Sequence, residues 1–201
     1  MTYGLALHGA GDTIEAFTKS LTYVASNTDS VDWHVPVADE RPTLSDALHY
    51  SGLAHRRFTF PCWDVERLAN PVERGGVLLG FSMGAITALR VLHASKPDTF
   101  SALVCIAGCY SALQPVTGRY RPPSRTGTRI LFIHGTNDRD IPPVLSRECA
   151  TGLLRSSHTV DYWSVPNAGH SWTELGLHTQ GSVADRLVRW IKTHAGRTSA
   201  P

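Results

Sequence analysis

The sequence has little of what marks membrane-spanning and nucleic-acid-coating proteins. Its 201 residues include only four cysteines, without the paired spacing of metal ligands, which indicates reduced thiols rather than a metal site. No apolar run approaches the roughly 18 residues of a membrane span. Lysine is scarce, with 3 residues against 16 arginines, and the arginines are scattered, so the formal net charge is only +2. We therefore expect neither a membrane span nor a nucleic-acid partner.

The N-terminus also lacks the pattern of an export signal. An apolar strand begins within three residues of Met1, without a basic region, a long apolar segment and a small-residue cleavage site. Together with the reduced thiols, this predicts a cytoplasmic protein. We expect no metal and no other cofactor, and the sequence leaves open whether the protein is a monomer or a homodimer.

The composition is that of an ordinary globular chain, with 42% hydrophobic and 18% charged residues. Its length suits one domain, which we assign to residues 1–195, followed by a C-terminal tail at 196–201. Residues 36–75 and 111–128 are irregular and rich in breakers, and we expect the second stretch to be a surface loop.

Short apolar runs alternate with segments of helical periodicity along the rest of the chain. The expected strands are Tyr3–Leu7, Val31–Val35, Val77–Leu79, Ala102–Ala107, Arg129–His134 and Val160–Val165. The expected helices run from Ile14 to Ser26, from Ala85 to before Pro97, from the Pro142–Pro143 pair to about Ser156 and from Val183 to His194, with short ones possible at Ser45–Leu53 and Val65–Leu68. The alternation predicts a mostly parallel sheet with helices on both faces, whose ligands bind at the carboxyl ends of the strands.

The chain is organised around Gly80-Phe81-Ser82-Met83-Gly84, a Gly-x-Ser-x-Gly pattern between an expected strand and an expected helix. A turn this tight holds its central residue in a strained conformation, and the residues two positions away must lack side chains. Ser82 would then project alone above the sheet as a nucleophile. The start of the helix that follows leaves backbone N–H groups unpaired, and these can stabilise an oxyanion.

A serine nucleophile needs a base, and a histidine base needs a carboxylate that holds its tautomer. Of the ten histidines, only His170 lies just beyond the last expected strand. Asp138 lies four residues past the preceding strand, and Asp140 is the reserve candidate. The order Ser82, Asp138, His170 is the order found in enzymes that use this turn. These three residues are our predicted catalytic triad.

These motifs resemble the α/β-hydrolase superfamily and, within it, the small carboxylesterase, lysophospholipase and acyl-protein thioesterase family. The resemblance is carried by the stretches Leu7-His8-Gly9-Ala10-Gly11-Asp12-Thr13, Val35-Pro36, Arg41-Pro42-Thr43-Leu44, Trp63-Asp64, Gly80-Phe81-Ser82-Met83-Gly84, His134-Gly135 with Asp138 and Ile141-Pro142, and Gly169-His170-Ser171. It implies a single-domain α/β-hydrolase without a large lid. It also implies an oxyanion hole formed by the backbone N–H groups of Ala10 and Met83, and a substrate cleft bordered by Trp63.

Further residues are expected near the substrate because of their positions in the pattern. His8, Gly9 and Cys109 follow expected strands at the edge where ligands bind, and Phe81 and Trp172 adjoin the motif residues. Trp63 belongs with Phe58 and Phe60 to an aromatic cluster that could line a cleft or form a satellite core. Met83 stands where the family commonly has glutamine, which leaves a backbone donor in place but puts the identity of the substrate in doubt.

We therefore predict a serine hydrolase that cleaves a small-molecule carboxylic ester or thioester through an acyl-enzyme. One alternative keeps the acyl-enzyme and changes the acceptor, which would make the protein a thioesterase or cyclising acyltransferase of a biosynthetic pathway. Another is a lyase or binding protein that has kept the fold for other chemistry. The presence of all three triad residues argues against a protein that only binds.

Overall fold

A parallel β-sheet forms the centre of the computed structural model, which describes residues 1–38, 63–69, 74–109 and 127–197. The strands are β1 (Thr2–Leu7), β2 (Val31–His34), β3 (Gly76–Phe81), β4 (Phe100–Ile106), β5 (Arg129–Gly135) and β6 (Thr159–Val165). They lie in the order β2-β1-β3-β4-β5-β6, and every neighbouring pair is parallel. The expectation of a mostly parallel sheet is confirmed, and in the described residues the sheet is entirely parallel.

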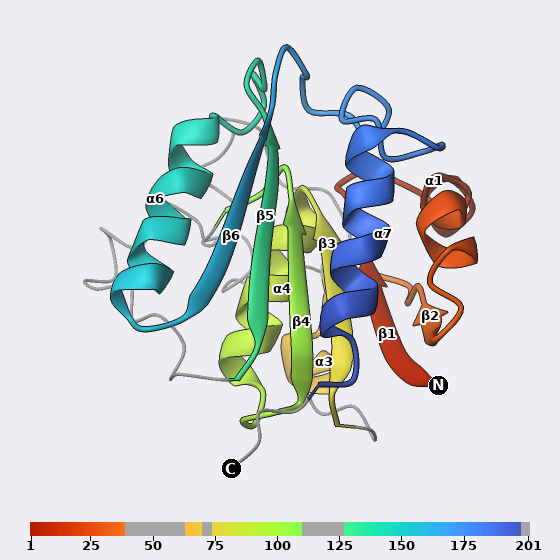
Figure 1. Cartoon of the computed structure of the whole chain (residues 1–201), viewed down its shortest axis with the longest axis vertical. Helices are drawn as coiled ribbons and strands as arrows, with labels where there is room; N and C mark the ends of the chain where they lie inside the picture. The colour runs from red at the N-terminus through yellow and green to blue at the C-terminus, as the bar shows by residue number, and fades with distance from the viewer. Residues whose placement is uncertain (39–62, 70–73, 110–126, 198–201) are drawn as a thin grey trace.

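Helices cover both faces of this sheet (Figure 1). The described helices are α1 (Ile14–Ser26), α3 (Val65–Leu68), α4 (Met83–Ala94), α6 (Pro143–Arg155) and α7 (Ser182–His194). α1 and α7 pack on one face, whereas α3, α4 and α6 lie on the other. None of the described helices is long and apolar enough to cross a membrane. The α/β architecture with one domain that the sequence predicts is therefore confirmed.

The elements agree with the expected ones within two residues at nearly every end. The largest difference that matters for function is at α4, which begins at Met83 rather than Ala85, so the helix starts directly after Ser82. Thr13 caps α1, because its side-chain oxygen accepts a hydrogen bond from the Ala16 amide at 3.1 Å. The possible helix at Ser45–Leu53, the aromatic residues Phe58 and Phe60, and residues 111–126 of the loop expected at 111–128 lie outside the described residues.

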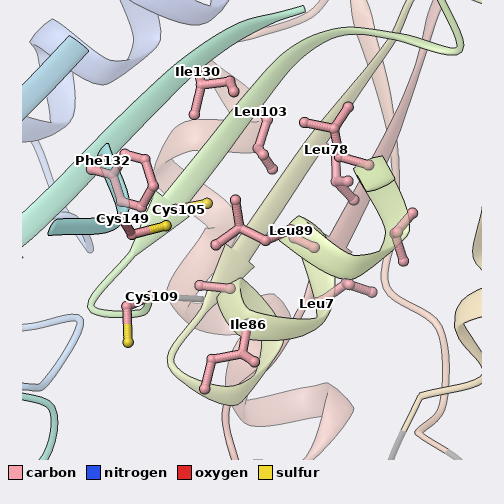
Figure 2. Close-up of a cluster of buried hydrophobic side chains, with 14 of the residues drawn as sticks. Leu7, Leu78, Ile86, Leu89, Leu103, Cys105, Cys109, Ile130, Phe132 and Cys149 are labelled. Atoms are coloured by element: carbon pink, nitrogen blue, oxygen red, sulfur yellow. The ribbon is translucent and has the colours of Figure 1, made fainter. Parts of the chain in front are cut away.

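The two central strands β3 and β4 are buried along their whole length, as parallel strands covered on both faces should be. Figure 2 shows the core on the α4 side, where Ile86 and Leu89 of α4 pack among side chains from the neighbouring strands. This core fixes α4 against the sheet. Because α4 starts at Met83, the same packing holds the Ser82 turn in position at the carboxyl edge of β3.

Three cysteines, Cys105, Cys109 and Cys149, are buried in this α4-side core and form no disulfide (Figure 2). Desolvation raises the pKa of the Cys109 thiol to about 12, with the nearby Cys149 and Asp138 adding to the effect. The pKa of Cys105 is raised well above its usual value for the same main reason. The thiols of Cys105 and Cys109 are therefore uncharged. Cys62 lies outside the described residues.

Candidate active site

Ser82 lies in the strained turn that its motif predicts. Its backbone has φ 54° and ψ −117°, a conformation that residues with a side chain rarely adopt. The Ser82 amide donates to the Ile106 carbonyl at 2.9 Å, which ties the turn to the end of β4. The surrounding core compensates the strain, as is usual at functional sites. The serine side chain is consequently raised above the sheet, at the end of β3 and the start of α4.

Gly80 and Gly84 allow the close packing that this turn requires. A Cβ atom on Gly80 would collide with the Gly84 backbone, and one on Gly84 would collide with the Leu7 carbonyl. Separations under 3.0 Å of this kind essentially never occur, and backbone atoms cannot move aside cheaply. The expectation that both positions must lack side chains is confirmed.

Replacement of Gly84 by alanine should therefore lower the free energy of unfolding by about 3 kcal/mol, because the new methyl group forces β1 and α4 apart. Urea unfolding followed by tryptophan fluorescence measures the effect. Gly181→Ala is the matched control, since a Cβ there would have only the Thr179 carbonyl, at 3.9 Å, within reach. Equal unfolding midpoints for the two variants would show that the turn tolerates a side chain.

The three residues of the predicted triad form a continuous hydrogen-bonded chain. His170 Nε2 is 2.8 Å from Ser82 Oγ, and His170 Nδ1 is 2.8 Å from Asp138 Oδ2. Asp138 follows β5 and His170 follows β6, so three loops at one edge of the sheet bring together side chains that are up to 88 residues apart in sequence. The reserve candidate Asp140 does not take part through its side chain, which is exposed. The Asp140 amide instead donates to Asp138 Oδ1 at 3.0 Å.

Asp138 is buried yet remains ionised. Burial alone would raise the pKa of its carboxyl group, but hydrogen bonds from His134, His170 and the Ile141 amide outweigh burial and hold the pKa well below its usual range. A carboxylate accepts hydrogen bonds only, so His170 must donate from Nδ1 and accept from the Ser82 hydroxyl at Nε2. This is the tautomer that can take the serine proton.

The turn after β1 contacts the start of α4. A Cβ on Gly84 would meet the carbonyls of Leu7 and His8, and one on Gly9 would lie 3.1 Å from the Phe81 ring. Asp12 closes this turn by accepting from the Gly9 amide at 3.1 Å. Ala10 lies in the same turn, and Met83 is the first residue of α4, where helix amides lack intrahelical partners. The arrangement agrees with an oxyanion hole at Ala10 and Met83, which stays a prediction.

The expected substrate-binding residues differ in how close they come to the surface. Phe81 lies against His170, with ring centroids 5.5 Å apart, and lines an open pocket. Trp63, Cys109 and Trp172 are only 3%, 0% and 5% exposed. Trp63 packs on His8, with ring centroids 4.7 Å apart, and belongs to the α4-side core. Of the two roles considered for it, cleft lining or core, its packing is that of a core residue. Contact of these three residues with a substrate, like that of His8 and Gly9, stays a prediction.

An open pocket of about 570 Å³ adjoins His170, and most of its lining was not foreseen from the sequence. Polar side chains from the loops after β5 and β6 supply it, namely Asn137, Arg139, Asp140, Asn167, Ser171 and Glu174. Hydrogen bonds of 3.2 Å and 2.7 Å from the amide and hydroxyl of Ser171 to Glu174 brace the loop that carries His170. Asp140 was the reserve acid and Ser171 lies in a motif stretch, whereas the sequence signal for the other four residues was their place after strands at the ligand-binding edge.

His134 is a further residue that sequence reasoning missed. It lies near the end of β5, and its Nε2 is 3.0 Å from Asp138 Oδ2. The spacing of four residues between His134 and Asp138, within the stretch that carries the resemblance, is the signal that could have indicated this contact. The site therefore contains two histidines around one carboxylate.

Comparison with known proteins agrees with this fold. Residues 66–180 match the phospholipase/carboxylesterase family. Solved structures of similar fold include SOBER1 of Arabidopsis thaliana (18% identity, TM-score 0.65, 96% of this chain and 98% of that chain), acyl-protein thioesterase 2 of Zea mays (18%, 0.64, 96% and 93%) and a carboxylesterase of Bacillus cereus (17%, 0.63, 96% and 88%). At such identities these structures establish the α/β-hydrolase fold. None of the curated proteins matches the sequence.

Proposed function

Because this chain belongs to the phospholipase/carboxylesterase family, we propose that it cleaves a carboxylic ester or thioester by nucleophilic catalysis at Ser82. Membership of the family makes the protein a serine esterase or thioesterase; the residues that act and the order of the steps are our proposal. The single observation that carries it is the unbroken chain of hydrogen bonds from Ser82 through His170 to Asp138. The strained backbone of Ser82 adds support, since a conformation this unfavourable persists where it serves a site.

In the acylation step, His170 Nε2 removes the proton from Ser82 Oγ as that oxygen attacks the acyl carbonyl. Asp138 stabilises the imidazolium that forms, because its depressed pKa keeps it negatively charged. The amides of Ala10 and Met83 donate to the carbonyl oxygen as it becomes an oxyanion, and one such donor is worth about 10² to 10³ in rate. His170 then protonates the departing alcohol or thiol, which leaves an acyl group on Ser82.

In the deacylation step, water takes the place of the leaving group. His170 removes a proton from this water, the resulting hydroxide attacks the acyl carbonyl, and the proton passes to Ser82 Oγ as the carboxylic acid departs. The open side of the site favours this step, because His170 keeps 20% of its side chain exposed and borders the pocket.

We further propose that the acyl chain is short or of medium length. Phe81 is the only large apolar side chain among the described residues that line the pocket, so a long chain would find little apolar surface to bury there. Burial of each methylene group contributes about 0.8 kcal/mol, which is roughly a fourfold gain in kcat/KM as long as the added carbon reaches apolar atoms. The gain should stop once the chain extends beyond them.

A series of p-nitrophenyl esters tests this proposal. We expect kcat/KM to rise over the first several carbons of the acyl chain and then to become constant. Ser82→Ala, assayed with every ester, supplies the background of uncatalysed and nonspecific hydrolysis. A value of kcat/KM that keeps rising to the palmitoyl ester would contradict the proposed chain length, and equal rates for the parent and Ser82→Ala would contradict hydrolysis at this site.

A further inference from the structure

The carboxylate of Asp138 lies between two histidines. His134, at the end of β5, is 1% exposed, and its Nε2 is 3.0 Å from Asp138 Oδ2, the oxygen that also contacts His170 Nδ1 at 2.8 Å. The other oxygen, Oδ1, accepts from the amides of Asp140 and Ile141 at 3.0 Å and 2.9 Å. Backbone amides thus hold Oδ1, whereas Oδ2 is shared by the two imidazoles.

The surroundings of His134 determine its tautomer. Its Nε2 lies 2.9 Å from the Ile141 carbonyl as well as near Asp138 Oδ2, and both of these atoms can only accept. Nε2 must therefore carry a hydrogen. Nδ1 is buried without a hydrogen-bond partner, so a hydrogen there would be an unsatisfied buried donor, which is costly. The imidazole is consequently the neutral form with its hydrogen on Nε2, and this N–H group is shared between the Ile141 carbonyl, its hydrogen-bond acceptor, and Asp138 Oδ2.

We propose that His134 is a positioning residue of the hydrolytic site, which withdraws charge from Asp138 Oδ2 through its Nε2–H group and so limits how strongly Asp138 stabilises the imidazolium form of His170. This inference rests on the proposed function. Because the two amides at Oδ1 hold the carboxylate without help from His134, the main effect of His134 is electrostatic: it tunes the basicity of the oxygen that faces His170.

The direction of the effect follows from the charge on Oδ2. Without the His134 donor, Oδ2 carries more negative charge and binds the imidazolium of His170 more strongly, which favours the protonated form of His170 over the neutral one. Catalysis requires neutral His170 as the base, so activity is then lost at a higher pH when the solution is acidified. A hydrogen bond to a charged group is stronger than one between neutral groups, and His170 senses part of its loss, so the acid limb moves upward by roughly 0.5 to 1 pH unit.

Other titratable and charged groups near this carboxylate do not obscure the measurement. The thiol of Cys109, after β4, stays protonated because burial raises its pKa to about 12. The pKa of Glu174, after β6, is lowered first by its hydrogen bonds with Ser171, so its carboxylate stays charged. Asp140 and Arg139 lie on the pocket side of the same loop as Asp138 and are present unchanged in every variant compared.

The test compares the dependence of kcat/KM on pH in the full-length parent, His134→Leu, His134→Met and His134→Gln, with a short-chain p-nitrophenyl ester as substrate. We expect both apolar variants to move the acid limb upward by roughly 0.5 to 1 pH unit, with KM changed by less than about twofold because His134 does not contact the substrate. His134→Gln keeps an N–H donor at similar reach, so its acid limb should coincide with that of the parent. The rate of fluorophosphonate labelling should show the same shifts without a bound substrate.

His158→Leu is the matched control, since it removes another buried histidine. His158 lies just before β6, at the amino ends of the strands and thus at the end of the sheet away from Asp138. It should change stability but not the acid limb. An unchanged or lowered acid limb in the apolar variants overturns the proposal, and so does failure of both to fold, because His134 would then serve the fold alone. These outcomes differ from failure of the proposed function, in which the parent itself neither hydrolyses esters nor is labelled at Ser82.

Discussion

Ser82→Ala lowers kcat by about 10⁴ to 10⁶ and leaves the fold intact, if Ser82 is the nucleophile. The hydroxyl contributes little to packing, because its one described hydrogen-bond partner is His170. Alanine also keeps the backbone strain of the turn, so the variant should unfold at the temperature of the parent. Ester turnover at saturating substrate and a thermal melt measure the two quantities on the same preparation.

Ser95→Ala is the matched control for this loss. Ser95 caps the other end of α4, where its hydroxyl donates to the Val91 carbonyl at 2.6 Å. Its replacement should reduce stability slightly and leave kcat at the value of the parent. Activity of Ser82→Ala within about tenfold of the parent would contradict a triad mechanism, since loss of the nucleophile alone abolishes nearly the whole triad contribution.

Asp138→Asn should have the second largest effect, a fall in kcat of about 10³ to 10⁴. The four donors around Asp138 explain why an amide cannot replace the carboxylate. Two backbone amides occupy one oxygen and two imidazoles the other, so the NH₂ group of asparagine meets another donor in either orientation. His170 then loses the acceptor that holds the hydrogen on its Nδ1, and its other tautomer cannot accept the serine proton.

Asp140→Asn is the comparison that assigns the acid, because it makes the same chemical change two residues away. The Asp140 side chain is exposed, and its amide, which contacts Asp138, is retained in the variant. Its kcat should stay within about threefold of the parent value, as for surface changes without a catalytic contact. The reverse order of the two effects would assign the third triad position to Asp140.

The sequence predicted the sheet well because the central strands, such as β3 and β4, are short apolar runs, which have few other interpretations. It also predicted that the strands are parallel, because they alternate with helices along the chain. The start of α4 was placed two residues too late, since the helical periodicity of apolar residues becomes visible only at Ala85. The first turn carries Met83 and Gly84, and their positions depend on the serine turn rather than on an apolar stripe.

The three residues Ser82, Asp138 and His170 were recognisable because each lies in the segment that follows a strand, and parallel strands bring their carboxyl ends together. The contact of His134 with Asp138 and the lining of the pocket could not be recognised from the sequence, because both depend on how the loops after β5 and β6 pack. The burial of Trp63 could not be predicted either, since an aromatic residue next to a motif packs as readily into a core as into a cleft.

Covalent labelling with a fluorophosphonate tests the central claim, that Ser82 is an activated nucleophile, most directly. The reagent reacts with a serine only where a base removes its proton, so the adduct identifies the nucleophile independently of the natural substrate. We predict one adduct per chain, located by mass spectrometry on the tryptic peptide from Gly75 to Arg90, and none in Ser82→Ala. Absence of an adduct in the folded parent, or an adduct that persists in Ser82→Ala, would contradict it.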